Sequence, residues 1–163
     1  MSDSFEELNC QKLKSIISEK TGKNVTVLYR GHHYNSKNSS GNFDKDVSNY
    51  YDMQNLLLIS DMLISDYSSS IWDFSFTYKP CLLYTPDLKE YEEARGFDED
   101  IHTWGFPMCV SNDILCDTVK NYDAQIHKSN MEEHHKSLGS FEKGNATKKV
   151  CELIIKEIKR RSK

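Results

Sequence analysis

The sequence predicts an α/β fold: a parallel β-sheet with helices packed on both faces. Short apolar segments rich in β-branched residues alternate with segments whose apolar residues recur at helical spacing, which is typical of strands joined by crossover helices. Residues 56–73 show this order most clearly. An apolar run ends in Ser65-Asp66-Tyr67, three serines follow, and an aromatic segment begins after them. The order indicates a buried strand, a tight turn and the start of a helix.

The first part of the chain predicts one helix and one strand before a polar loop. Residues 5–19 carry apolar side chains at helical spacing, and this helix is expected to stop before the turn that begins with Thr21-Gly22. Residues 25–29 form a short β-branched strand. Residues 35–46 are polar, contain glycine and serine clusters and have no periodicity, so a mobile loop is expected there.

The rest of the chain continues the alternation, and residues 1–163 are expected to form one domain. The predicted helices cover residues 52–59, 69–78, 112–122 and 147–161, and the predicted strands cover residues 62–64 and 80–84. Residues 88–107 are expected to be loop-like, with helical turns.

The turn of three serines has two interpretations. Where a strand ends and a helix begins, backbone N–H groups and the positive helix end bind anions, which favours a phosphate site. Ser70 and Asp73 also fit a capping box, which needs no ligand. The junction holds more polar groups than a cap requires, namely Asp66, Tyr67, Ser68, Ser69, Ser70 and Asp73. This density favours the phosphate site.

Composition and charge narrow the classes of function. The chain has 21 Lys and Arg against 25 Asp and Glu, a formal charge of -4, and no basic stripe in its middle, so nucleic acid is not an expected partner. No apolar run approaches the ~20 residues of a membrane span, and the first residues do not resemble a signal peptide. The five cysteines include no Cys-x-x-Cys pair, so reduced thiols in a cytoplasmic protein are expected. No two histidines have the i,i+4 spacing of a metal-ligand pair, so no metal site is expected.

Several motifs follow one another in a fixed order. They are Arg30-Gly31-His32, the run from Asp61 to Asp73, Lys79-Pro80, the series Tyr84, Asp87, Tyr91 and Arg95-Gly96-Phe97, and Gly144-Asn145-Ala146. Over residues 5–158 this order resembles the carboxyl-terminal half of the CDP-glycerol:poly(glycerophosphate) glycerophosphotransferases, the polymerases and primases of teichoic acids and capsules. The run Ser-Asp-x-Leu-Ile-Ser-Asp-Tyr-Ser-Ser-Ser-x-x-Asp-Phe is its most specific part.

The resemblance implies a GT-B architecture, in which two Rossmann-like halves face each other across a cleft. The carboxyl-terminal half of the family binds the nucleotide-activated donor, so this chain is expected to be one Rossmann-like donor-binding domain. The first strand of that half and the amino-terminal acceptor half have no counterpart in the sequence. The resemblance implies no bound cofactor.

The implied function is transfer of alditol phosphate from CDP-glycerol or CDP-ribitol to a growing teichoic-acid or capsule-type polymer, with release of CMP. The polymer acceptor would be held by the missing amino-terminal half, so the fragment alone is expected to be inactive. The alternative is a non-catalytic nucleotide-binding or interaction module of the same fold. Glycerol and ribitol enzymes share these motifs, so the alditol stays open.

The resemblance also implies roles for individual residues. Arg30 and His32, at the end of an early strand, would face the donor diphosphate and serve catalysis. Donor binding would fall to Asp66, Ser68, Ser69, Ser70, Asp73 and Arg95. The other histidines in the polar helical stretch, His127, His134 and His135, are expected at the surface.

The end of the chain is basic, with Lys156, Lys159, Arg160, Arg161 and Lys163 on or next to the last predicted helix. Such a helix end can contact anionic lipid at the inner face of the cell membrane. It can equally be a solvated terminus whose cations complement the helix dipole. A cytoplasmic protein, with or without peripheral contact to the membrane, is therefore expected.

Overall fold

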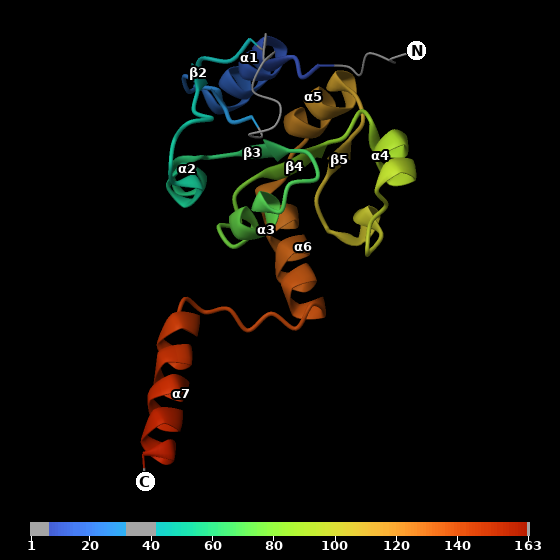
Figure 1. The fold of residues 1–163 in the computed structure, drawn as a ribbon. Coiled ribbons are helices and arrows are strands. Elements are labelled where there is room, and N and C mark those ends of the chain that lie inside the picture. Colours follow the sequence, from blue (N-terminus) through green and yellow to red (C-terminus); the bar gives the residue numbers. More distant parts are fainter. Residues whose placement is uncertain (1–6, 32–41, 163) are drawn as a thin grey trace. The chain divides into compact units, whose positions relative to one another are not determined.

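The computed structural model describes residues 7–31 and 42–162 (Figure 1). Contacts within the chain divide it into two compact units, Met1–Met131 and Glu132–Lys163. All of the described strands belong to the first unit. That unit also carries the serine turn, so it is the part that positions a candidate site.

The first unit alternates helices and strands. Its helices are α1 (Cys10–Thr21), α2 (Met53–Ile59), α3 (Ser70–Ser75), α4 (Leu88–Ala94), α5 (Asn112–Lys120) and the beginning of α6 (Ala124–Ser137), with a 3-10 turn η1 at Ile101–Thr103. Its strands are β1 (Leu28–Tyr29), β2 (Lys45–Asp46), β3 (Leu63–Ser65), β4 (Cys81–Tyr84) and β5 (Met108–Cys109).

All described strand pairs are parallel, which confirms the α/β fold class. They form two sheets, β1-β2 and β3-β4-β5, rather than one continuous sheet. In the larger sheet β4 is central, and Leu63 pairs with Cys81 while Leu83 pairs with Met108. The helical segments between β3, β4 and β5 are the crossovers that parallel neighbours need.

Helices cover both faces of the larger sheet, as Figure 1 shows for α1 and α5 on one side and α3 on the other. Side chains of β4 alternate between the faces because the strand period is two residues. Leu82 packs with residues of α1 and α5, whereas Cys81 and Leu83 pack with α2 and α3. Cys81 is fully buried. It therefore fills the core as a small side chain.

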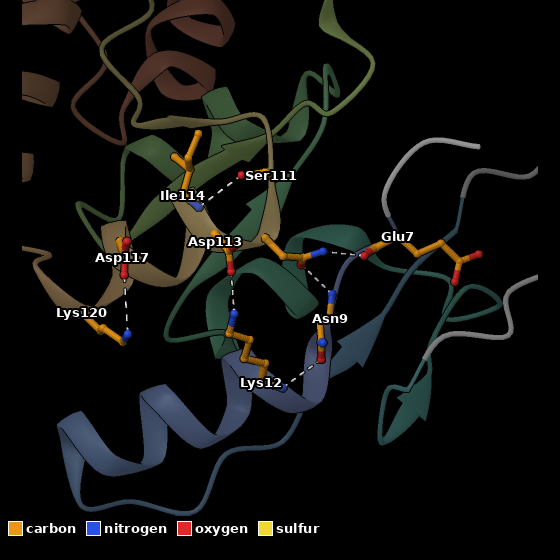
Figure 2. A network of polar contacts seen from close by, with 9 residues as sticks. Glu7, Asn9, Lys12, Ser111, Asp113, Ile114, Asp117 and Lys120 are labelled. Atoms are coloured by element: carbon orange, nitrogen blue, oxygen red, sulfur yellow. Dashed lines mark hydrogen bonds and ion pairs between the residues drawn. The ribbon is translucent and has the colours of Figure 1, made fainter. Parts of the chain in front are cut away.

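A polar network sets the start of α1 (Figure 2). Asn9 Oδ1 accepts from the backbone N–H of Lys12 at 3.0 Å, so Asn9 is the N-cap. The backbone N–H of Asn9 donates to Asn112 Oδ1 at 2.7 Å, and Lys12 Nζ pairs with Asp113 at 2.7 Å. The helix therefore begins at Cys10, later than the predicted start. The reason is that its N-cap residue, Asn9, is hydrogen-bonded to Asn112 at the beginning of α5.

The polar segment predicted as a loop over residues 35–46 contains a strand at its end. Lys45–Asp46 pair with Leu28–Tyr29 as β2. Asp44 anchors this pairing, since its Oδ2 accepts from the backbone N–H of Val27 at 2.7 Å and its carboxylate pairs with Lys14. Residues 35–41 lie outside the described residues. The strand was missed because its side chains are exposed on both faces and leave no apolar alternation.

The structure also corrects the elements around the aromatic segment. Helix α3 ends at Ser75 instead of Tyr78. Tyr78 has a φ of 55°, a left-handed conformation that cannot continue a helix. The Lys79 Nζ donates to the Leu58 and Ser60 carbonyls at the end of α2, at 2.9 and 2.7 Å. Helix α4 lies in the region predicted to be loop-like with helical turns, and strand β5 directly follows that region.

The surface prediction for two histidines is wrong. His127 and His134 are only 3% and 8% exposed, although α6 is polar along its length. Neither ring nitrogen of His127 forms a hydrogen bond of ordinary geometry. Burial lowers the pKa of His127, and the nearby backbone of Lys79 partly offsets this by favouring the charged ring.

This burial predicts a pH dependence of stability. Between the lowered pKa of folded His127 and the ordinary value of 6.5, the unfolded chain binds a proton that the folded chain does not. The free energy of unfolding should therefore fall as the pH drops below about 6.5, and the fall should be smaller in His127→Leu. Urea unfolding at several pH values measures this slope. The exposed His102, changed to Leu, is the control, and an equal slope in all three proteins would contradict the prediction.

The second unit contains the end of α6 and helix α7 (Ala146–Arg161), which agrees with the predicted helix over residues 147–161. Several aliphatic side chains of α7 are exposed, namely Val150, Leu153, Ile154, Ile155 and Ile158. In its last turn Glu157 pairs with Arg160 and Arg161. Among the residues described, none of the helices combines the length and apolarity needed to cross a membrane.

Candidate functional site

The candidate site lies where β3 and β4 end. Because neighbouring parallel strands point the same way, the residues after each strand meet at one edge of the sheet, the usual position of ligands in open α/β sheets. Ser65 pairs with Leu83 in this register. Beyond them, the hydroxyl of Tyr67 donates to Asp87 Oδ1 at 2.9 Å. The serine turn after β3 and the beginning of α4 after β4 are thereby joined.

The serine turn is held by hydrogen bonds of its own. Asp66 Oδ1 accepts from the backbone N–H of Ser68 at 3.0 Å. The hydroxyls of Ser68 and Ser70 lie 3.0 Å apart, and Ser68 Oγ also accepts from the backbone N–H of Ser70 at 3.4 Å. The Ser69 side chain is exposed and makes no capping bond. Ser69 is therefore the serine of this turn whose hydroxyl is left for another partner.

The capping-box interpretation of this turn is wrong. Ser69, not Ser70, stands at the N-cap position, and the Ser69 side chain makes no capping hydrogen bond. Asp73 instead accepts from Gln54 Nε2 of α2 at 3.2 Å. The polar groups at the start of α3 are thus used for the Asp66 turn and for a link to α2, rather than for a reciprocal cap.

An aromatic stack stands beside the turn and leads to Arg95. The Tyr67 ring stacks on Tyr91 of α4, with centroids 3.7 Å apart, and Tyr91 stacks on Phe97 at 5.3 Å. The guanidinium of Arg95 lies over the Tyr91 ring, 5.8 Å from its centroid. Burial and the hydrogen bond to Asp87 raise the pKa of Tyr67, so its hydroxyl stays protonated and donates.

Arg30 has a structural function that the sequence did not suggest. Its Nη1 donates to the backbone carbonyls of Val47 and Tyr50 at 3.3 and 2.7 Å, which holds the segment between β2 and α2. Its described hydrogen bonds do not reach the serine turn. His32, its predicted partner in catalysis, lies outside the described residues.

A hollow of about 530 Å³ is lined by residues of α4 and of the segment that follows it. Its lining includes Glu92, Glu99, Asp100 and Phe97. These three carboxylates repel an anionic ligand, so the hollow does not suit a diphosphate. Within the described parts of the chain, no group of three or more His, Cys, Asp or Glu side chains could hold a metal ion.

Of the six residues assigned to donor binding, the structure places five on the turn and helix after β3 and one, Arg95, at the end of α4. The serine turn, Asp73 and Arg95 lie around the ends of β3 and β4, and Tyr67 and Asp87 connect them. The signal for Asp87 and Tyr91 was present in the sequence as spacing only. Their contacts with Tyr67 could not be predicted from this spacing, because contacts between residues 20 or more positions apart depend on the order of the strands.

Comparison with known proteins decides the family. The family model described as CDP-Glycerol:Poly(glycerophosphate) glycerophosphotransferase matches residues 4–156 of the 163. The chain belongs to this family. The resemblance found in the motifs is thereby confirmed.

Relatives within the glycerophosphotransferase family have related descriptions. A teichoic acid poly(glycerol phosphate) polymerase of Bacillus spizizenii is 34% identical over 155 residues, covering 88% of this chain and 38% of the relative. A teichoic acid ribitol-phosphate polymerase of Staphylococcus aureus is 31% identical over 111 residues, covering 64% and 22%. This chain therefore spans well under half of the relatives that it matches.

A solved structure of a teichoic acid polymerase has the same fold. The structure of the wall teichoic acid polymerase TagF superposes with a TM-score of 0.68 at 28% identity, covering 91% of this chain and 38% of that chain. A variant of TagF soaked with CDPG superposes with a TM-score of 0.69 at 27% identity, covering 98% and 41%.

Proposed function

We propose that this chain is the donor-binding part of a transferase that moves glycerol phosphate or ribitol phosphate from a CDP-alditol to a teichoic-acid or capsule-type polymer. Family membership supports the reaction class, and the TagF structures soaked with CDPG support CDP-glycerol as the donor. The geometry that carries the proposal is the serine turn at the carboxyl end of β3, with Arg95 on the neighbouring segment.

The proposed site uses the turn and Arg95 for the donor diphosphate. The Asp66 turn holds Ser68 and Ser70 in place, and the exposed Ser69 hydroxyl can donate to a phosphate oxygen. Arg95 supplies a cation for the charge that develops on the departing CMP. Asp73, oriented by Gln54, would accept from a ribose or glycerol hydroxyl.

Catalysis is assigned to the segment after β1. His32, in its protonated form, would neutralise charge on the leaving group or pass a proton. Arg30 would support it from the strand end, where its Nη1 already fixes the backbone before α2. The polymer acceptor would be held by the part of the family that has no match in this chain.

A second candidate function is a CDP-alditol or nucleotide binder without transferase activity. The observation in its favour concerns Arg30, which was assigned to catalysis: its described hydrogen bonds go to the Val47 and Tyr50 carbonyls and not to the serine turn. Contact of α7 with an anionic membrane surface also belongs to the proposal. Its motivation is a helix with exposed aliphatic side chains on which Lys and Arg outnumber Glu.

The test of the donor site is Ser69→Ala. This change should weaken CDP-glycerol binding by about 1–2 kcal/mol, because a hydrogen bond to a charged oxygen is lost. Thermal stability should stay unchanged, since the Ser69 hydroxyl does not cap α3. Isothermal titration calorimetry with CDP-glycerol, CDP-ribitol and CMP measures the affinity.

The matched control is Ser111→Ala. Ser111 Oγ caps α5 by accepting from the backbone N–H of Ile114 at 3.3 Å, so its loss should lower stability by about 1 kcal/mol and leave CDP-glycerol affinity intact. Unchanged affinity in Ser69→Ala would remove the serine turn from the donor site.

A further inference from the structure

Asp87 stands at the N-cap of α4 but does not cap it. An aspartate at this position ordinarily accepts from a backbone N–H of the first helical turn. Here no side-chain capping bond is formed, and Asp87 Oδ1 accepts from the Tyr67 hydroxyl at 2.9 Å instead. The carboxylate is thus used to hold a tyrosine 20 residues away rather than to stabilise its own helix.

Tyr67 connects the two halves of the candidate site. In the chain it stands between Asp66 and Ser68, whose hydrogen bond of 3.0 Å shapes the serine turn. Its ring lies on Tyr91, with centroids 3.7 Å apart. The Tyr91 carbonyl accepts from the backbone N–H of Arg95 at 2.9 Å, and the Arg95 guanidinium lies over the Tyr91 ring. A continuous series of contacts therefore runs from the serine turn to Arg95.

We propose that Tyr67, Asp87 and Tyr91 form a positioning unit that sets the distance between the serine turn and Arg95, and thereby the affinity for the donor diphosphate. The proposal rests on the proposed function, which places the diphosphate at these two elements. Protein groups that are held in position before binding bind a multiply charged ligand more tightly than groups that must be ordered on binding. The unit acts through Ser69 and Arg95 and does not touch the ligand itself.

The variant that isolates this function is Tyr67→Phe. It keeps the ring and its stack on Tyr91, and it removes only the hydroxyl that Asp87 holds. CDP-glycerol affinity, measured by calorimetry on the full chain, should fall about tenfold, the size expected for one hydrogen bond between a part-buried pair. The control is Tyr122→Phe, since the Tyr122 hydroxyl is buried without a hydrogen-bond partner and lies outside the site. Its affinity should not change.

Asp87 provides an independent pair of variants. Asp87→Asn keeps an oxygen that can accept from Tyr67, so it should restore most of the affinity that Asp87→Ala loses. A purely structural contribution would instead lower the melting temperature of Asp87→Ala while leaving affinity, measured well below melting, unchanged. That second result would overturn the positioning assignment, and it remains measurable even where Tyr67→Phe fails to fold.

Coupling to Arg95 completes the test. If Tyr67 places Arg95, then Arg95→Gln should reduce affinity less in the Tyr67→Phe background than in the wild-type chain. Additive effects, or wild-type affinity in both Tyr67→Phe and Asp87→Ala, would overturn the positioning unit and leave the donor site standing. Absence of CDP-glycerol binding in the wild-type chain would overturn the proposed function, and this inference with it.

Discussion

A protein made of these 163 residues alone is expected to bind CDP-glycerol but not to extend a poly(glycerol phosphate) chain. The chain spans 38% of the polymerase that it resembles, and the acceptor is assigned to the unmatched part. Holding both reactants in line can account for ~7–11 kcal/mol of a reaction barrier. Without a held acceptor, slow hydrolysis of the donor is the most activity expected.

The measurement is release of CMP from CDP-glycerol, with and without a lipid-linked glycerol phosphate acceptor. Hydrolysis that depends on the donor site should fall in Ser69→Ala, which separates it from a contaminating phosphatase. Chain growth that depends on the acceptor would show that these residues position both substrates. It would overturn the division of donor and acceptor between two parts of the family.

The largest effect on stability is expected at Phe74. This residue is 0% exposed and belongs to the cluster in which α2 and α3 pack against Cys81 and Leu83 of β4. Phe74→Ala should lower the free energy of unfolding by about 3–5 kcal/mol, because both buried area and packing contacts are lost. Urea unfolding, with the m-value checked for two-state behaviour, gives this quantity.

The same segment offers a matched control. Phe76 immediately follows α3 and is 44% exposed, so Phe76→Ala removes the same side chain from a position half open to water. A loss below about 1 kcal/mol is expected there, as for other exposed positions. Equal losses at Phe74 and Phe76 would mean that the described packing of α3 against the sheet is wrong.

Local sequence patterns predicted a helix or strand correctly where the residues of that element themselves show the pattern. Helices α2 and α7 start within a residue of their predicted positions, since Asp52 is a strong N-cap and the α7 pattern is long and periodic. Strand β4 (Cys81–Tyr84) lies within the strand predicted over residues 80–84, because its own residues form an apolar run. These signals act over a few residues and do not depend on the rest of the fold.

Elements fixed by distant partners were predicted poorly. β2 is polar and exists through its pairing with β1 and the anchor at Asp44, which contacts Val27 and Lys14. Burial of His127 on a polar helix arises because the α/β unit covers that part of α6, which no helical periodicity revealed. Arg30 illustrates the same limit, since its bonds to Val47 and Tyr50 depend on how the chain returns after β2.

The sequence by itself determined the α/β class, the family, and the strand, serine turn and helix at which a donor site is proposed. Those features depend on residue order and short-range spacing, which the chain carries in any conformation. Only the tertiary structure decided that Asp87 holds Tyr67 instead of capping α4, and that Asp73 pairs with Gln54 instead of with Ser70. The reason is physical: a carboxylate has several partners within local reach, and the order and direction of the strands select the one that it meets.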